Sequence, residues 1–284
     1  MHSLIRDGER TLRAAGIDSA RREAEWVLGH LLAVRPLELY LREAPIPGAI
    51  VQQFQAMIAQ RATGMPLQYL LGETEFFGHP ITVAPGVFIP RPETEVVVQT
   101  ALELLRTRQT ALRRPLRLLD FGTGSGCIAL TLAERLEACV VVGVEVTWGA
   151  LRIARQNVLR HRLDSRVWLV QGHWGEAVSG GFDGIVSNPP YVSRAQLERV
   201  PREVRHEPQV SLAAGEDGLE ALGVILAEAP RLLLAGGIIV LECGEQHVET
   251  LLEHATALSW VRLADPIADL SGRPRGVAIH RHAE

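Results

Sequence analysis

Hydrophobic positions along the chain change their spacing near residues 64 and 116. Before residue 64 they recur every three or four residues, beginning with Leu4, Ile5 and Leu12, which is the spacing of amphipathic helices. Between residues 64 and 92, proline, glycine and aromatic residues crowd together. Extended pieces near 75–77 and 81–83, joined at Gly78-His79-Pro80, predict a β-hairpin there.

After residue 116, short apolar runs alternate with amphipathic stretches, which indicates strands alternating with helices. Such alternation predicts a doubly wound α/β fold with a mainly parallel sheet. The expected domains are a helical domain at 1–64, a hairpin linker at 65–92 and an α/β domain at 93–284. We expect strands at 116–121, 139–145, 167–170, 184–187, 237–241, 260–264 and 276–280, with helices opening near 92 and covering 127–136, 149–161, 219–233 and 246–257.

Composition narrows the class of protein. The 284 residues are 47% hydrophobic, and the net charge is −4, so no basic field attracts nucleic acid as a bulk polyanion. Three cysteines without CxxC spacing fit a reducing cytoplasm and argue against a disulfide framework or a zinc site. The start has no signal-type apolar core, and the longest uncharged apolar run, 232–241, is too short to span a bilayer. We therefore expect a cytoplasmic protein with no membrane segment and no metal.

One unusual stretch, FDGIVSNPPYV at residues 182–192, combines an apolar strand with a stiff ending. Pro189 and Pro190 have no N–H for a neighbouring strand, and each holds the residue before it in extended geometry. A stiff turn with the carboxamide of Asn188 and the ring of Tyr191 can present fixed groups to a flat substrate. The alternative is a strand-ending loop with an ordinary Asn cap.

A second stretch, DFGTGSG at residues 120–126, lies between the first strand and its helix. Glycines at alternate positions let a ligand approach the main chain, and in an open parallel sheet ligands bind at this end. The dinucleotide fingerprint G-x-G-x-x-G is not met, because Cys127 stands where the third glycine would fall. Glu145 ends the next strand and can accept hydrogen bonds from ribose hydroxyls, or it is a solvated acid.

Together these motifs resemble class I S-adenosylmethionine-dependent methyltransferases: GTGSG after strand one, an acid after strand two, and NPPY after strand four. Over nearly its whole length the chain resembles the release-factor glutamine methyltransferase family, also called HemK/PrmC. The most specific motif is IPRPETE at 89–95. The others are GMPLQYLLG at 64–72, Glu207-Pro208, GEDGL at 215–219 and LECG at 241–244.

The resemblance implies a Rossmann-like, seven-stranded sheet, a substrate-recognising helical domain, and S-adenosylmethionine as cofactor with S-adenosylhomocysteine as product. It implies that Trp174 borders the adenine and Glu145, where the family usually has Asp, holds the ribose. His173 stands where the family commonly has Asp, and it either contacts the adenine or lies at the pocket rim. The residues that would wrap the methionine part are Gly122, Thr123, Gly124, Ser125 and Gly126.

The resemblance also implies that Asn188, Pro189, Pro190 and Tyr191 receive a substrate glutamine, with Asn188 also touching the cofactor. The Asn188 oxygen and the Pro189 carbonyl can each accept one N–H of the substrate amide, which holds the nitrogen in line and stabilises its developing positive charge. Tyr191 can pack on the flat amide. No general base is required; Glu93 and Glu95 are expected to be scaffolding.

The implied partners are class I peptide chain release factors, methylated at N5 of the glutamine in their GGQ loop by a monomeric enzyme. Three alternatives remain at this point. One is a glutamine methyltransferase for a ribosomal protein, which shares the fold and NPPY. Another is an adenine-N6 methyltransferase for nucleic acid, which the acidic balance disfavours. The last is a noncatalytic cofactor-binding module, which the intact NPPY disfavours.

Overall fold

The structure, a computed structural model, describes residues 1–41 and 44–284. Contacts divide these residues into two compact units, Met1–Glu73 with Pro201–His206, and Thr74–Val200 with Glu207–Glu284. By contacts the hairpin therefore groups with the sheet. The domain boundaries expected from the sequence, at residues 64 and 92, stay predictions.

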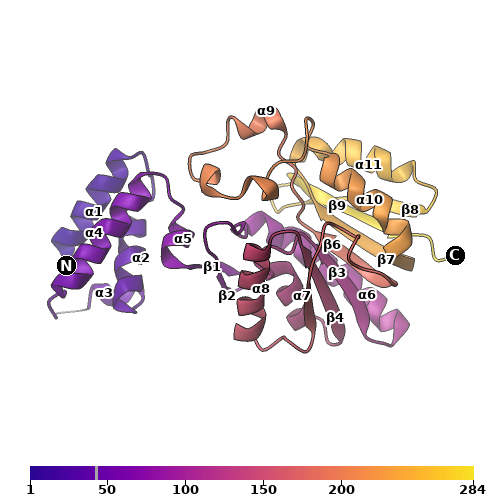
Figure 1. The fold of residues 1–284 in the computed structure, drawn as a ribbon, viewed down its shortest axis with the longest axis horizontal. Helices are drawn as coiled ribbons and strands as arrows, with labels where there is room; N and C mark the ends of the chain where they lie inside the picture. Colours follow the sequence, from indigo (N-terminus) through magenta and orange to yellow (C-terminus); the bar gives the residue numbers. More distant parts are fainter. Residues whose placement is uncertain (42–43) are drawn as a thin grey trace. The chain divides into compact units, whose positions relative to one another are not determined.

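The first unit is helical, as its apolar spacing predicted. Its core includes Leu12, Leu28 and Phe54, one from each of three helices. A short helix within 64–72 was not expected, because proline, glycine and aromatic residues crowd together after residue 64. Pro66 precedes this helix, and Gly72 ends it with φ +78°. The helices are α1 (His2–Ala14), α2 (Ala20–Leu32), α3 (Pro36–Leu39), α4 (Gly48–Ala62) and α5 (Leu67–Leu71), drawn in indigo and purple in Figure 1.

A buried cation joins residues distant in sequence within this unit. The Arg61 side chain is 3% exposed and lies 2.6 Å from the Glu23 carboxylate. Arg61 also pairs with Glu203, which lies in the segment Pro201–His206. A buried arginine needs such partners, since an unpaired charge away from water is strongly unfavourable. The ion pairs explain why a segment between β6 and α10 packs with the first unit.

The second unit is built on a seven-stranded sheet in the order β5-β4-β3-β6-β7-β9-β8. The central strands are parallel, and β9 runs antiparallel to both β7 and β8. This confirms the predicted fold class. The strands are β3 (Leu116–Phe121), β4 (Cys139–Glu145), β5 (Val167–Gln171), β6 (Phe182–Ser187), β7 (Leu233–Glu242), β8 (Val261–Ala268) and β9 (Pro274–Arg281).

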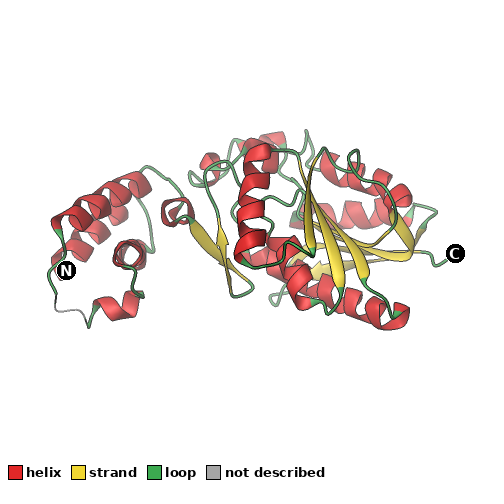
Figure 2. Cartoon of the chain, turned by 60° about the horizontal axis from the view of Figure 1, so that its bottom comes forward, coloured by secondary structure: helices red, strands yellow, loops and turns green. Residues whose placement is uncertain are grey.

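Helices cover both faces of this sheet, as Figure 2 shows. On one face α6 packs beside α7, and α7 beside α8. On the other, α10 and α11 bury leucine, isoleucine and valine side chains against central strand residues such as Phe121 and Ile239. The helices are α6 (Pro92–Leu112), α7 (Cys127–Arg135), α8 (Trp148–Arg160), the short α9 (Arg194–Leu197), α10 (Glu220–Leu232) and α11 (Val248–Thr256).

The predicted hairpin is present as a two-stranded sheet of β1 (Glu73–Phe76) and β2 (His79–Thr82), but its turn is displaced. Phe77 and Gly78 form the turn, with φ of +52° and +79°. Two central residues with positive φ are typical of the type I′ turn, whose twist matches paired strands. His79 and Pro80 therefore begin a strand, where the sequence suggested the turn.

Several strands extend beyond their predicted bounds, and β7 and β8 show the physical reasons. β7 begins at Leu233 rather than near 237, because the chain passes from α10 into the strand and Gly236 takes φ +66° within it. β8 continues past Pro266, which an edge strand tolerates since one side of it needs no ladder.

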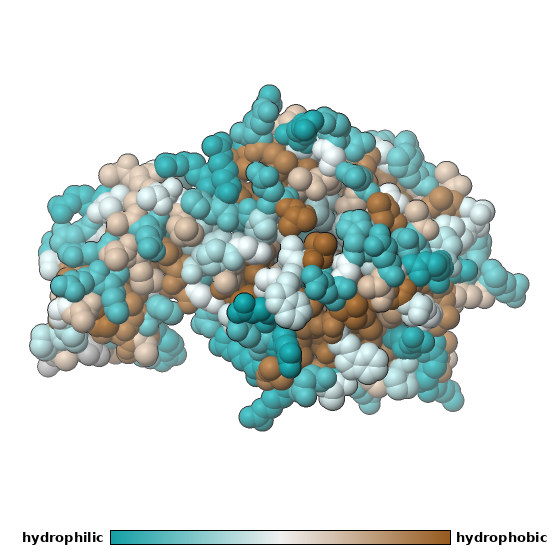
Figure 3. Space-filling view, viewed as in Figure 1, coloured by the Kyte–Doolittle hydropathy of each residue, from teal (hydrophilic) through white to brown (hydrophobic). Residues whose placement is uncertain are grey.

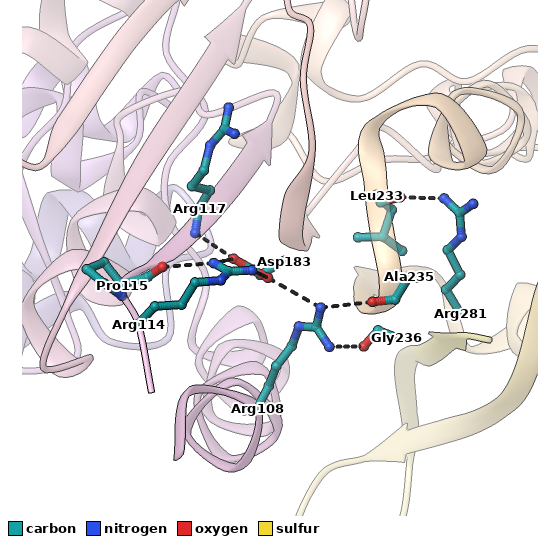
Figure 4. Close-up of polar contacts among 9 residues, drawn as sticks. All are labelled: Arg108, Arg114, Pro115, Arg117, Asp183, Leu233, Ala235, Gly236 and Arg281. Atoms are coloured by element: carbon teal, nitrogen blue, oxygen red, sulfur yellow. Dashed lines mark hydrogen bonds and ion pairs between the residues drawn. The ribbon is translucent and has the colours of Figure 1, made fainter. Parts of the chain in front are cut away.

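Charged residues fix the start of β6, the strand that ends just before Asn188. The Asp183 side chain is fully buried, and both its oxygens accept 2.8 Å hydrogen bonds from Arg114. Figure 4 shows Arg108 and the Arg117 main-chain N–H approaching the same carboxylate, at 3.3 and 3.0 Å. Burial alone would raise the pKa of Asp183, but the Arg114 and Arg117 hydrogen bonds outweigh it and hold the pKa below its usual range.

Polar side chains cover much of the face seen in Figure 3, and hydrophobic ones appear there in separate areas. Within residues 1–41 and 44–284, no helix is both long enough and apolar enough to cross a bilayer.

Candidate functional site

A cavity of about 250 Å³ opens at the carboxyl ends of the parallel strands β3, β4 and β6. This is the edge where ligands bind in open α/β sheets, because the loops that follow the strands diverge there. Its wall is drawn from residues within 88–94, 122–128, 144–146, 172–174, 188–190, 210–214 and 220–224.

The glycine-rich loop forms one side of the cavity. Gly122, Gly124 and Gly126 have φ of +66°, +55° and +83°, so the loop needs residues without a Cβ. Gly126 does not reach the wall; a Cβ there would lie 3.3 Å from the Cβ of Ala154 on α8, so it allows close helix packing. The buried Ser125 hydroxyl lines the cavity and, among the described residues, has no hydrogen-bond partner.

Glu145 lies at the end of β4, is 7% exposed and lines the cavity. Its Oε2 accepts a hydrogen bond from the Gly124 N–H at 3.0 Å. Its Oε1 accepts from both the N–H and the hydroxyl of Thr147, each at 2.9 Å. The carboxylate therefore holds the glycine-rich loop to β4. A carboxylate has about four acceptor sites, so one remains for a ligand.

Asp120, the acid of β3, lies beneath the loop and has no access to water. Its Oδ2 accepts from the Thr123 hydroxyl at 2.6 Å and from the Ala129 N–H at 3.1 Å. Burial raises the pKa of Asp120 to about 7, against these hydrogen bonds. Asp120 thus ties the loop to the first turn of α7, a role that the sequence motif did not reveal.

His173 and Trp174 follow β5 and both line the cavity. The Trp174 ring meets Phe121 edge to face, with centroids 6.1 Å apart, and packs against the central core. The His173 side chain is 59% exposed, with its Nδ1 3.5 Å from the Glu176 carboxylate. The structure therefore places His173 at the cavity rim.

The NPPY turn divides between the cavity and the protein interior. Asn188 and Pro190 line the cavity, and the Asn188 amide nitrogen donates to the Thr94 hydroxyl oxygen at 3.0 Å. Pro189 is buried, and neither it nor Tyr191 belongs to the cavity wall. The Tyr191 hydroxyl donates to Glu242 Oε1 at 3.2 Å.

Glu242 ends β7 beneath this turn. Burial raises the pKa of Glu242 to about 7, against the opposing Thr94 and Tyr191 hydroxyls. Burial and the neighbouring carboxyl also raise the pKa of Tyr191. Neither Thr94 nor Glu242 was singled out from the sequence, although they lie in the motifs IPRPETE and LECG.

The segment that carries Phe88, Pro90 and Thr94 is held in place by acids. Glu207 accepts a hydrogen bond from the Ile89 N–H at 3.1 Å and also pairs with Arg91. Glu95 accepts from the Phe77 N–H at 2.8 Å and so pins the hairpin turn to α6. These contacts give physical roles to IPRPETE and Glu207. The wall residues Val210, Ser211, Ala213 and Ala214 were not foreseen, because their segment shows no periodic pattern.

The arrangement suits an organic ligand. Backbone N–H groups, a free hydroxyl, a carboxylate and an aromatic ring surround one end, and a fixed carboxamide marks the other. In the part of the chain that the structure describes, no cluster of three or more His, Cys, Asp or Glu side chains is placed to hold a metal ion.

Comparisons with known proteins agree with this architecture. Residues 3–72 match the model of the PrmC N-terminal domain, and residues 81–217 match that of the methyltransferase small domain. A solved methyltransferase structure from Pyrococcus furiosus is 23% identical, covers 73% of this chain and 91% of its own, and superposes with a TM-score of 0.51, which supports the fold.

Sequence relatives are more specific. The release factor glutamine methyltransferase of Nitratidesulfovibrio vulgaris is 37% identical over 99% of this chain and 95% of its own. That of Moorella thermoacetica is 36% identical over 100% of this chain and 99% of its own. Identity at this level over the full length of both proteins confirms the resemblance stated from the motifs. The chain belongs to the release factor glutamine methyltransferase family.

Proposed function

We propose that this chain transfers a methyl group from S-adenosylmethionine to the side-chain nitrogen, N5, of the glutamine in the GGQ motif of peptide chain release factors. One observation carries the proposal furthest. Asn188 lies in the wall of the cavity that the glycine-rich loop also lines, and its Nδ2 already donates to Thr94. The group that Asn188 offers a ligand is therefore its oxygen, which accepts hydrogen bonds as a substrate amide requires.

The cavity residues fit S-adenosylmethionine. The unpartnered Ser125 hydroxyl and the exposed backbone of the glycine-rich loop suit its amino-acid part, and the remaining acceptor site of Glu145 suits a ribose hydroxyl. Trp174 would border the adenine, with His173 beside it at the rim. When bound, the cofactor supplies a methyl group already activated by a positively charged sulfur.

The protein's part in the reaction is placement and electrostatics. Asn188 Oδ1 and the Pro189 carbonyl would each accept one N–H of the substrate amide and fix its nitrogen in line with the methyl carbon. Both acceptors stabilise the positive charge that develops on that nitrogen, so they bind the transition state more tightly than the ground state. Pro190 completes the wall beside Asn188, and Tyr191 closes the turn. The N-methylated amide then loses a proton to water, so no residue is assigned as a base.

The protein partners would be release factors, as the names of the relatives say of those proteins. The helical unit then has a natural role in recognising the body of the release factor, and the reaction would take place in the cytoplasm on a monomeric enzyme. Direct nucleic-acid binding is not part of the proposal, in keeping with the net charge of −4.

A substrate panel tests this function. The purified chain is incubated with S-adenosylmethionine carrying a labelled methyl group and, in separate reactions, a release factor, the same factor with its GGQ glutamine changed to alanine, ribosomal proteins, and DNA. Label on the intact release factor alone is expected. Label on a ribosomal protein or on adenine, with none on the release factor, would overturn the proposal.

A further inference from the structure

Glu242 is a buried acid next to the candidate site that the proposed chemistry does not use. Glu242 is the last residue of β7, is 2% exposed and does not line the cavity. Its Oε1 accepts a hydrogen bond from the Tyr191 hydroxyl at 3.2 Å. Oε2 is buried and has no hydrogen-bond partner among the described residues. Burying a carboxyl group in this way is unfavourable unless something requires it.

Thr94 connects this acid to the cavity. It lies in the first turn of α6, is 2% exposed, and its Oγ1 accepts the Asn188 amide nitrogen at 3.0 Å. In that contact Thr94 is the acceptor, so its own proton is left for the Glu242 carboxyl, whose pKa the hydroxyl lowers. A hydroxyl has one proton and two lone pairs. If the proton points to Glu242, only lone pairs remain for Asn188.

This leaves one favourable orientation of the Asn188 carboxamide. An amide can rotate so that its oxygen and nitrogen exchange places, and the hydrogen-bond partners decide which arrangement is stable. Facing the lone pairs of Thr94, Asn188 must present its NH₂ group there. Its oxygen is then the atom left for a ligand. In the opposite orientation Asn188 would present donors to a substrate NH₂, which is itself a donor.

We propose that Glu242 is a positioning residue that, through Thr94, fixes the Asn188 carboxamide with its oxygen toward the substrate and, through the Tyr191 hydroxyl, holds the NPPY turn. The inference rests on the proposed function for its catalytic meaning. It goes beyond that function because it assigns a task to Thr94 and Glu242, which the proposed reaction does not use.

The variants are chosen to keep shape. Thr94→Val removes only the hydroxyl, whereas Thr94→Ser keeps it. Glu242→Gln replaces one acceptor oxygen with a donor NH₂. When that NH₂ faces Thr94, the Thr94 hydroxyl accepts from it and turns its own proton toward Asn188. The double variant joins Thr94→Val and Glu242→Gln. Glu93→Gln is the matched control, because its charge also acts on Glu242 and Tyr191 but no hydrogen bond joins it to Asn188 among the described contacts.

Single-turnover methyl transfer to a release factor is measured for the full-length proteins, together with affinity for the cofactor. We expect Thr94→Val and Glu242→Gln each to slow transfer by about tenfold or more, since small misplacements of an aligned group have effects of this size. The double variant should be no slower than the slower single one, because both break the same connection. Thr94→Ser and Glu93→Gln should stay within about threefold of wild type, and cofactor affinity should hardly change. Wild-type rates in Thr94→Val, or effects that multiply in the double variant, would overturn the inference.

Hydrogen exchange of the Asn188 side-chain NH₂, followed by NMR without substrate, separates this inference from the proposed function. Slow exchange in wild type, and exchange about tenfold faster or more in both Thr94→Val and Glu242→Gln, would support the positioning role even if release factors are not the substrate. Unchanged exchange in both variants would overturn it even if release factors are methylated.

Discussion

Replacing Glu145 with alanine tests how the cavity holds a nucleoside. The carboxylate accepts hydrogen bonds from the Gly124 N–H and from two Thr147 groups at 2.9–3.0 Å, and it is 7% exposed. Hydrogen bonds to a charged group contribute about 1.5–3 kcal/mol each, but water can enter this open site and satisfy the donors left behind. We therefore expect Glu145→Ala to lower the free energy of unfolding by about 1–3 kcal/mol in total.

Cofactor affinity should fall by a similar amount, because the ribose loses its acceptor and the glycine-rich loop loses its tie to β4. A loss of about 1–3 kcal/mol is about a 5- to 150-fold rise in Kd. Isothermal titration calorimetry with S-adenosylmethionine measures it, and chemical denaturation gives the stability. Glu137→Ala, an exposed acid just before the opposite end of β4, is the matched control and should change neither. Tight cofactor binding by Glu145→Ala would refute both the ribose assignment and the role of the loop.

Three further outcomes follow from the structure. Asp183→Ala should lower the free energy of unfolding by about 1.5–3 kcal/mol, because Arg114 and Arg108 lose their buried partner, although Arg114 is 41% exposed and water can hydrate it. Since the pKa of Asp183 is lowered in the folded state, denaturation curves of the wild type should show this stabilisation at neutral pH and its loss as pH falls below about 4. Glu242 shows the opposite pH dependence, because its pKa of about 7 in the folded state lies above the ordinary value. The carboxyl therefore destabilises the fold as pH rises from about 4.5 to 7. Over that range, the free energy of unfolding of Glu242→Gln, measured from denaturation curves, should rise by up to about 3 kcal/mol relative to wild type. Calorimetry should show binding of S-adenosylmethionine and S-adenosylhomocysteine but not of NAD, because Cys127 replaces the third glycine of the dinucleotide motif; tight NAD binding would contradict this.

The sheet was predictable because each central strand is a short apolar run that must be buried on both faces. Residues 139–145, for example, contain little but valine, cysteine and glycine before Glu145. The glycine-rich loop was predictable for a related reason, since alternating glycines at a strand end are typical of a loop whose backbone needs positive φ. The hairpin turn begins one residue and ends two residues earlier than predicted, because Phe77 adopts a positive φ that its side chain disfavours and Pro80 was a stronger local signal for a turn.

The network beneath NPPY could not be foreseen in the same way. Thr94 begins α6, Asn188 follows β6 and Glu242 ends β7, so the three residues are far apart in the sequence. Each alone is an ordinary polar residue near the end of an element. Their contacts depend on how α6, β6 and β7 pack. Likewise, nothing local indicated that Glu145 already serves the loop, because Gly124 donates through its backbone. The spacing of hydrophobic residues predicts the helices and strands, whereas the hydrogen bonds between them are seen only in the folded chain.

The sharpest test of glutamine methylation by this chain is a site map of the transferred methyl group. A release factor is incubated with the full-length enzyme and S-adenosylmethionine, digested, and analysed by tandem mass spectrometry in a time course, with Asn188→Ala in parallel. We expect one methyl group on the side-chain nitrogen of the GGQ glutamine. We also expect Asn188→Ala to slow its appearance by about 10²-fold or more, since one preorganised transition-state group has that effect. A methyl group on another residue, or wild-type transfer by Asn188→Ala, would contradict the proposed reaction.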